Sequence, residues 1–242
     1  MRRRQALTLN VRISVRRMLA RRYLRGEGLE IGALHLPLPL PASARATYID
    51  RLSTSELRRA LPELADKAIV DVGVIDDGER LRSVADGTQE FVIANHMIEH
   101  CEDPVGTIRH HLRVLRPGGR LFMAVPEKRR TFDRDREVTP FEHVLRDYQK
   151  GREWSRAEHY REWAQFFEGA PPERLDERAR YMEEHGWCIH FHVWTRQAFR
   201  ALLAECRDTL GFPLEVDVVW PNLAEFVVVC RRTSGELPAA PR

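Results

Sequence analysis

The chain has 242 residues, of which 43% are hydrophobic and 31% charged, and its formal net charge is +3. This length and composition are typical of a soluble globular protein with one sizeable core. No run approaches the roughly 18 apolar residues that a membrane-spanning helix needs. The cysteines (Cys101, Cys188, Cys206 and Cys230) are widely spaced. Their spacing argues against a zinc ribbon or a disulfide framework and favours a reducing cytoplasm.

Positive charge is concentrated at the N-terminus. Residues 1–26 contain nine arginines and no acid, so +3 minus this +9 leaves −6 for the rest of the chain. An acidic body argues against a nucleic-acid partner. Residues 1–25 predict a basic helix with one apolar face, formed by Val11, Val15, Met18, Leu19 and Tyr23. We expect this helix to cap the domain with its arginines in solvent; the alternative is weak contact with an anionic membrane surface.

The next part of the chain predicts strands and one helix. Residues 26–33 predict a strand that ends in a glycine turn, and residues 46–50 predict a second strand. Residues 54–64 predict a helix, and residues 68–74 a third strand. Residues 76–79 follow the carboxyl end of that strand, which is where open α/β sheets bind ligands.

The stretch from Glu90 to Pro126 predicts a strand, a helix and another strand. Residues 91–94 are a short apolar run typical of a buried strand. Asp103 and Pro104 begin a helix, and its apolar residues recur at spacings of three and four. Pro117-Gly118-Gly119 ends that helix, and residues 121–125 predict the second strand. Two strands joined by a helix within about 35 residues run parallel.

The region after Pro126 contains nearly seventy residues before Thr195, more than a simple crossover needs. Helices are expected over residues 140–148, 152–167 and 172–184. The region is rich in tryptophan and histidine: His143, Trp154, His159, Trp163, His185, Trp187, His190, His192 and Trp194. We interpret residues 127–194 as an inserted cap that builds a substrate pocket, because aromatic walls with a few polar groups suit a polyhydroxylated ligand.

The end of the chain predicts a helix capped by Thr195 and two strands, over residues 214–220 and 226–230. Residues 233–242 are expected to form a disordered tail. The main domain is therefore expected to span residues 26–232.

Motifs between residues 95 and 119 resemble those of class I S-adenosylmethionine (SAM) dependent methyltransferases, in particular the type 11-like bacterial group. They are Asn95-His96-Met97-Ile98-Glu99-His100 after one strand, Asp103-Pro104, and Arg113-Val114-Leu115-Arg116-Pro117-Gly118-Gly119 before the next. The resemblance implies an α/β fold: a doubly wound, Rossmann-like sheet, mostly parallel with an antiparallel last strand. The helical cap would be inserted after the fifth strand. It also implies SAM as cofactor and a small-molecule acceptor.

The resemblance further implies cofactor-binding residues at the ends of the first two strands. Gly32 would let the backbone approach SAM, and Glu30 would lie near its methionine amino group. Asp50 follows Glu30 by 20 residues and would accept hydrogen bonds from the ribose hydroxyls. One departure from the family pattern stands out. Residues 33–39 contain prolines and no further glycine, so this loop cannot make the usual tight turn into a helix.

Later strand ends supply the remaining expected contacts. Either Asp76 or Asp77 would accept a hydrogen bond from the adenine amino group, while the other caps a short helix through residues 81–84. Asn95 and His96 would lie beside cofactor and substrate.

Methyl transfer to an alcohol would need a base for the hydroxyl proton, and a histidine suits neutral pH. Our first candidate is His143, followed by His96 and His192, with Asp133 as a carboxylate alternative. The expected acceptor is a small-molecule hydroxyl or amine, with a sugar of a surface polysaccharide as the first choice.

Two other classes of protein also fit parts of the sequence. A methyltransferase fold that has lost its cofactor and serves as a scaffold would explain the missing glycines. A metal hydrolase would use His190 and His192 with His143 or His159, or the H-x-x-E-H pattern from His96 to His100. We expect ordinary hydrogen-bonded histidines and assign no metal ligand.

Overall fold

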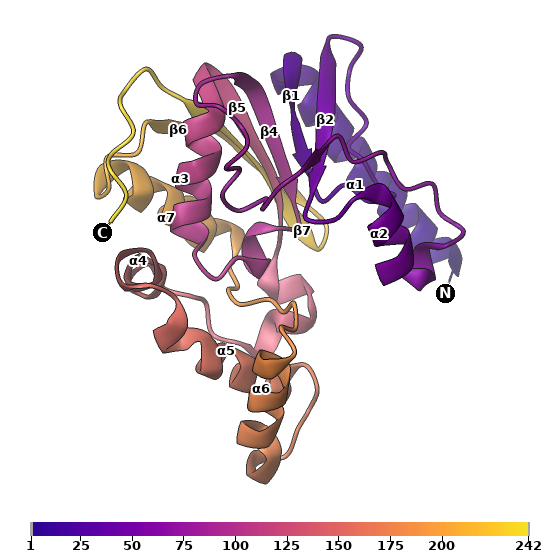
Figure 1. Cartoon of the computed structure of the whole chain (residues 1–242), viewed down its shortest axis with the longest axis vertical. Helices are drawn as coiled ribbons and strands as arrows, with labels where there is room; N and C mark the ends of the chain where they lie inside the picture. The colour runs from indigo at the N-terminus through magenta and orange to yellow at the C-terminus, as the bar shows by residue number, and fades with distance from the viewer. Residues whose placement is uncertain (1, 242) are drawn as a thin grey trace.

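A computed structural model describes the backbone of residues 2–241 and the side chains of residues 12–241. Within these residues, seven strands form one sheet in the order β3-β2-β1-β4-β5-β7-β6 (Figure 1). They are β1 (Gly26–Ile31), β2 (Ala44–Asp50), β3 (Val74–Ile75), β4 (Gln89–Asn95), β5 (Leu115–Pro126), β6 (Leu214–Asn222) and β7 (Glu225–Arg232). The pairs formed by β1 to β5 with one another are parallel, whereas β7 is antiparallel to both β5 and β6. The expected fold class is confirmed.

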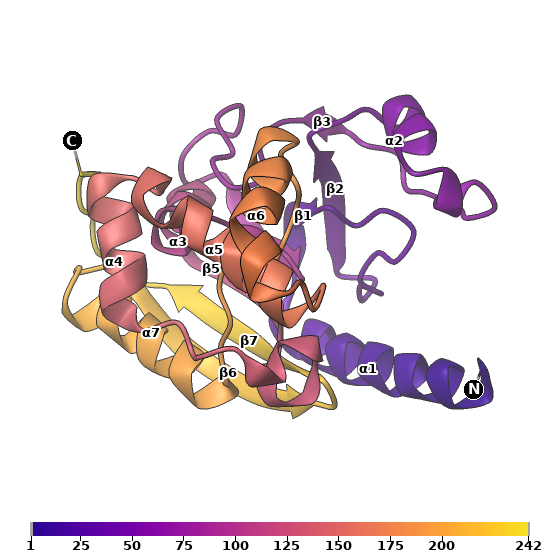
Figure 2. The same cartoon turned by 90° about the horizontal axis from the view of Figure 1, so that it is seen from below.

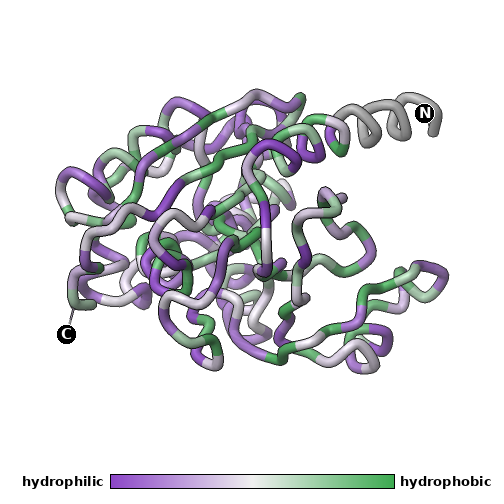
Figure 3. Tube along the Cα trace, turned by 90° about the horizontal axis from the view of Figure 1, so that it is seen from above, coloured by the Kyte–Doolittle hydropathy of each residue, from purple (hydrophilic) through white to green (hydrophobic). Residues whose placement is uncertain are grey.

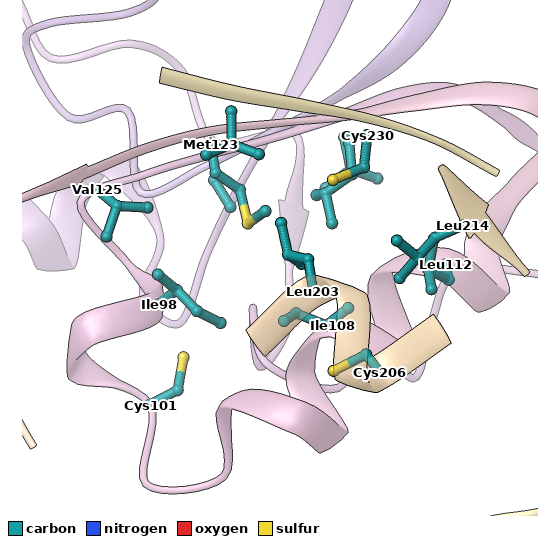
Figure 4. Close-up of a cluster of buried hydrophobic side chains, with 14 of the residues drawn as sticks. Ile98, Cys101, Ile108, Leu112, Met123, Val125, Leu203, Cys206, Leu214 and Cys230 are labelled. Carbon is teal, nitrogen blue, oxygen red and sulfur yellow. The ribbon is translucent and has the colours of Figure 1, made fainter. Parts of the chain in front are cut away.

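Helices cover both faces of the sheet because the central strands are apolar on both sides. Phe91 and Ile93 of β4 pack with Leu19 and Ala20 of α1 (Arg2–Tyr23) on one face. The opposite face packs against α3 (Pro104–Val114) and α7 (Arg196–Asp208). There, Ile108 and Leu112 meet Leu203, Met123 and Cys230 (Figure 4). Hydrophobic residues accordingly gather on the strands in the middle of the molecule (Figure 3).

The β4–α3–β5 unit agrees with the sequence prediction. The Asp103 side chain accepts a hydrogen bond from the Gly106 amide at 2.8 Å and caps α3, with Pro104 at its first position. The end of the helix differs slightly, because α3 stops at Val114 and β5 already begins at Leu115. Thr195 likewise caps α7 as expected, by accepting from the Ala198 amide.

Two predictions for residues 68–88 are wrong. The third strand is only Val74–Ile75, because β3 lies at the edge of the sheet and pairs with β2 alone. Turns replace the short helix expected over residues 81–84, and Leu81 has a φ of 48°. Upstream, the expected helix over residues 54–64 divides into α2 (Thr54–Ala60) and a single 3-10 turn, η1 (Pro62–Leu64). Pro62 explains the division, since proline has no amide hydrogen to continue the helix.

The N-terminal helix caps the sheet, as expected, but its arginines are not all in solvent. Arg12 and Arg16 both bind the buried Glu225 at the start of β7. Val11, which was predicted to lie on the apolar face of this helix, is outside the residues whose side chains are described. Within residues 2–241, no helix is long and apolar enough to cross a membrane.

The cap projects from the end of the sheet at which β1 and β2 finish (Figures 1 and 2). It contains α4 (Phe141–Lys150), α5 (Glu153–Phe166) and α6 (Leu175–Glu184), with the 3-10 turns η3 (Lys128–Arg130), η4 (Phe132–Asp135) and η5 (Pro172–Arg174). A further turn, η2 (Ile98–His100), follows β4. The cap has a small apolar cluster of its own around Trp163 and Met182.

Two residues after position 232 contact the domain. Leu237 packs against the main core, and the Pro238 carbonyl accepts two hydrogen bonds from the Arg109 guanidinium. The other described residues of this segment form no helix or strand, and six of residues 233–241 are exposed.

Candidate functional site

A cavity of about 400 Å³ lies where the strands end and the cap begins. Four successive strands and the cap contribute to its wall. The lining residues are Ile31, Gly32, Asp50, Arg51, Asp77, Gly78, Glu79, Met97, His100, Cys101, Glu102, Arg152 and Cys188. Its position outside the carboxyl ends of parallel strands is the usual ligand position in this kind of sheet, and its size is that of a small-molecule site.

Three of the expected cofactor residues line this cavity: Gly32, Asp50 and Asp77. Gly32 directly follows β1 with a φ of 62°, and a Cβ atom there would meet no atom within 4 Å. The backbone at Gly32 is thus left-handed and open to an approaching ligand. Asp50 is the last residue of β2, where its carboxylate makes only a long hydrogen bond of 3.4 Å with the Leu52 amide.

The two aspartates after β3 have different surroundings. Asp76 accepts hydrogen bonds from the amide and hydroxyl of Ser83, at 2.8 and 2.6 Å, and from the Asp77 amide. Burial alone would raise the pKa of Asp76, but these hydrogen bonds lower it below its usual value. Asp76 therefore holds the turn, and Asp77 is the member of the pair that lines the cavity.

Glu30 lies outside the cavity lining. Its neighbours Leu29 and Ile31 face α3 and α7, so strand alternation turns Glu30 toward α1. One carboxylate oxygen accepts from the Leu38 amide at 2.8 Å, and the other is buried without a hydrogen-bond partner. Burial raises the pKa of Glu30 to about 7, although the Leu38 amide and Arg16 oppose the shift.

The loop after β1 does not make a tight turn into a helix, as its prolines and missing glycines predicted. Within residues 32–43 the chain forms no helix, and Leu38 packs on the α1 face of the sheet. Leu34 has a φ of 49°, and its carbonyl accepts from the Val70 amide. The cavity therefore has no helix N-terminus beside β1.

Asn95 and His96 end β4 but do not line the cavity. His96 Nε2 lies 2.8 Å from the Glu225 carboxylate and 3.0 Å from Arg12, and its Nδ1 lies 3.3 Å from Glu99. Burial opposes protonation of this imidazole, but hydrogen bonds with Glu225 and Glu99 raise the pKa of His96 overall. Its ring is thus committed to an ion-pair network under α1.

His100 lines the cavity, although the sequence analysis considered it only as a metal ligand in the metal-hydrolase alternative. Its Nδ1 lies 2.8 Å from the Ile189 carbonyl oxygen, so this nitrogen must carry the proton and donate. Nε2 is then the unprotonated, acceptor nitrogen. Burial lowers the pKa of His100, in spite of the neighbouring Glu99 carboxylate. The resemblance motif contained His100, but nothing in the motif singled it out.

The cap contributes Arg152 and Cys188 to the cavity, which sequence reasoning also missed. Arg152 lies between α4 and α5 and reaches Glu102 at 3.5 Å and Glu79 at 3.9 Å. Burial, together with the nearby Asp77 carboxylate, raises the pKa of Glu79 to about 7. Cys188 Sγ lies 3.4 Å from His100 Nδ1. These long-range contacts have no signal in sequence spacing.

His143 and His192, our other expected bases, do not line the cavity. They gather inside the cap with His159 and Asp147. His190 lies apart from them, because its Nδ1 binds Asp133 at 2.7 Å. His190 and His192, which the metal-hydrolase alternative grouped together, therefore have different partners.

The strand order, the antiparallel β7 and the cavity at the strand ends together define a Rossmann-like methyltransferase fold. In agreement with it, residues 26–123 match the family model of the methyltransferase domain. The resemblance seen in the sequence is confirmed over this segment. No curated protein matches the chain.

Solved structures with a similar fold include several methyltransferases. A SAM-dependent methyltransferase from Aquifex aeolicus is 13% identical, with a TM-score of 0.47, and the alignment covers 87% of this chain and 85% of the other. One from Methanosarcina mazei is 17% identical at a TM-score of 0.47, with coverages of 88% and 95%. A putative one from Methanococcus maripaludis is 15% identical at 0.47, with coverages of 97% and 90%.

Proposed function

We propose that this protein transfers a methyl group from SAM to a hydroxyl or amine of a small molecule. One observation carries the proposal: Gly32, Asp50 and Asp77, which follow three successive strands, meet in one cavity at the edge where this fold binds ligands. The cavity is stronger support for SAM binding than the glycine motif after β1, because the cavity is present although the usual glycines after Gly32 are absent.

The three residues suit different parts of the cofactor. The Asp50 carboxylate would accept hydrogen bonds from two ribose hydroxyls, and the Asp77 carboxylate would accept from the adenine amino group. Gly32 leaves room for the cofactor beside β1. SAM supplies an activated methyl group, so the protein mainly aligns the acceptor behind the sulfonium and excludes water.

The cap forms the opposite wall of the cavity and would hold the acceptor. Arg152 and Cys188 come from it, and the Arg152 guanidinium lies near Glu79 and Glu102. Charged groups that already line a cavity suit a polyhydroxylated acceptor, and a sugar of a surface polysaccharide remains our first choice.

His100 fits the role of the base better than His143, His96 or His192, because it alone among these histidines lines the cavity. With SAM bound, attack of the acceptor oxygen on the methyl carbon would break the carbon–sulfur bond and release S-adenosylhomocysteine (SAH). The hydroxyl proton passes to Nε2 of His100, which is the unprotonated nitrogen because Nδ1 donates to Ile189. His100→Gln should slow transfer from tritiated SAM to a sugar acceptor, whereas unchanged turnover would remove His100 from the mechanism.

Calorimetric titration with SAH tests the cofactor site directly. We expect micromolar binding, weakened by about 1–3 kcal/mol in Asp50→Ala through loss of a charged hydrogen-bond acceptor. Asp66→Ala removes an exposed aspartate outside the cavity and is the matched control. Equal affinity of wild type and Asp50→Ala would remove Asp50 from the site. Absence of binding by the folded wild-type protein would support the scaffold alternative, which the missing glycines favour.

A second partner is proposed for α1. A broad hollow of about 1150 Å³ runs along this helix, lined by arginines together with Met18 and Trp220, which are 48% and 45% exposed. Basic and apolar side chains together suit an anionic membrane surface. We expect salt-sensitive sedimentation with anionic vesicles, reduced in Arg17→Ser/Arg21→Ser but not in Arg180→Ser, an exposed site on the cap. Equal binding by all three proteins would contradict this partner.

A further inference from the structure

Four side chains with metal-binding atoms converge inside the cap, outside the cavity. His143 and Asp147 lie on α4, His159 on α5 and His192 in the segment before α7. Each offers one ligand atom, and the four atoms all lie within 4.8 Å of one another. His143 Nε2 is 3.1 Å from His159 Nε2 and 3.4 Å from Asp147 Oδ2, and His192 Nε2 is 3.6 Å from the same oxygen.

Three of the separations between ligand atoms are close to those of a tetrahedral zinc site. Zinc lies about 2.0–2.1 Å from imidazole nitrogen and carboxylate oxygen, so neighbouring ligand atoms of a tetrahedron are about 3.3 Å apart. The observed distances of 3.1, 3.4 and 3.6 Å fall on both sides of that value.

Hydrogen bonding within the cluster leaves a buried atom unsatisfied. Asp147 Oδ2 points among the three imidazoles, yet it is buried and has no hydrogen-bond partner. Asp147 as a whole is only 1% exposed. A buried acceptor without a partner costs about 1–3 kcal/mol, and a bound cation would remove that cost.

The surroundings orient the carboxylate as a ligand. The Ser155 hydroxyl donates to Asp147 Oδ1 at 2.9 Å, which fixes the carboxylate with Oδ2 toward the imidazoles of His143 and His192. Such a hydrogen bond from a neighbouring residue to a ligating side chain is common in metal sites. His159 and His192 are buried and His143 is partly exposed, so the four ligands enclose the site almost completely.

The donor atoms select among metals. Three imidazoles and one carboxylate suit zinc, whereas calcium and magnesium prefer six or more oxygen ligands. Four protein ligands also leave no open position, which is typical of structural rather than catalytic zinc. The neighbouring group of Glu99, His100 and His190 is less suitable, because it offers three ligand atoms where a structural zinc site has four.

We propose that His143, Asp147, His159 and His192 bind one zinc ion that fastens α4 and α5 to the chain before α7. This proposal replaces our expectation that the protein binds no metal. It also differs from the metal-hydrolase alternative, in which His190 was a ligand. The ion would compensate for the small apolar cluster of the cap, as structural metals do in small units. It would also fix the cap over the cavity, because the His192 amide donates to the Glu99 carbonyl in the turn after β4, beside the cavity wall.

The test is the metal content of protein purified without a metal-affinity step. We expect one zinc per chain by mass spectrometry, and a tetrahedral absorption spectrum after cobalt replaces zinc. The Asp147→Asn and His159→Gln variants should each contain much less than one zinc ion per chain. His185→Gln removes an exposed histidine of the same cap outside the cluster and should keep it.

Thermal unfolding with and without a zinc chelator supplies a second measurement. The chelator should lower the Tm of wild type and His185→Gln, but not that of Asp147→Asn. Folded wild-type protein without zinc that also fails to bind added zinc or cobalt would overturn the proposal, as would zinc retained by both cluster variants. None of these outcomes depends on methyl transfer, so the zinc site and the proposed function fail separately.

Discussion

Arg16 in α1 donates two hydrogen bonds to Glu225, which lies 209 positions later at the start of β7. Nε binds Oε1 at 2.8 Å, and a terminal guanidinium nitrogen binds Oε2 at 2.6 Å. Arg12, His96 and Asn222 bind the same carboxylate. The buried Glu225 carboxylate therefore joins the N-terminal helix to the C-terminal end of β4 and the start of β7.

Glu225→Gln should destabilise the protein by roughly 2–4 kcal/mol, because it leaves two guanidinium groups without their buried counter-charge. Urea unfolding at neutral pH measures this. Glu215→Gln on the adjacent strand breaks only an exposed pair with Arg231 and should cost less than about 1 kcal/mol. Similar losses in both variants would show that the Glu225 network contributes no more than a surface pair.

The same variant should show a defined pH dependence. Burial alone would raise the pKa of Glu225, but hydrogen bonds from His96 and Arg16 hold it well below its usual value. In acid the unfolded chain therefore binds a proton that the folded chain does not, so this stabilisation is complete above the unfolded pKa of about 4.5 and is lost as pH falls. The stability difference between wild type and Glu225→Gln should shrink below about pH 4.5; a constant difference would contradict this reasoning.

Glu30 should have the opposite effect. The pKa of Glu30 is about 7 in the folded protein, whereas its usual value is 4.5. Between pH 4.5 and pH 7, the folded chain therefore keeps a proton on Glu30 that the unfolded chain has lost. Stability should fall across this interval, by up to about 3 kcal/mol. Glu30→Gln should therefore gain stability relative to wild type from about pH 5 to about pH 8, as followed by thermal unfolding. Glu27→Gln, at an exposed position of the same strand, should show no such gain.

Cys188 should be the reactive cysteine of the folded protein, because its thiol is exposed while Cys101, Cys206 and Cys230 are buried. Partial burial of the thiol raises the pKa of Cys188. Alkylation of Cys188 should therefore be slow at neutral pH and faster near pH 9, and mass spectrometry can follow it. Saturating SAH should slow alkylation, since Cys188 lines the cavity. Cys188→Ser should take up no label. Reaction at a second cysteine, or no protection by bound SAH, would contradict the assignment.

Local patterns in the sequence were enough to predict the central part of the fold. The strand at residues 91–94, the Asp103 cap and the periodic face of α3 depend on neighbours within a few residues, and the structure contains them all. The edge strand β3 was predicted too long, because pairing on one side only ends it after two residues.

The candidate site was predictable only in part. Gly32, Asp50 and Asp77 follow strands, and strand ends can be read from sequence. Arg152 and Cys188 enter through the fold of the cap, which no spacing specifies. Asp147 had a readable signal that we did not use: it lies four residues after His143, so both share one face of a helix.

The position of α1 has a consequence for where the physical unit begins. The family match starts at residue 26, but Leu19, Ala20 and Leu24 cover the strand residues Phe91 and Ile93. A protein cut at residue 26 would expose these side chains to water and leave Glu225 without its arginines. The part of the chain that buries these strand residues therefore includes the basic helix ahead of the matched segment.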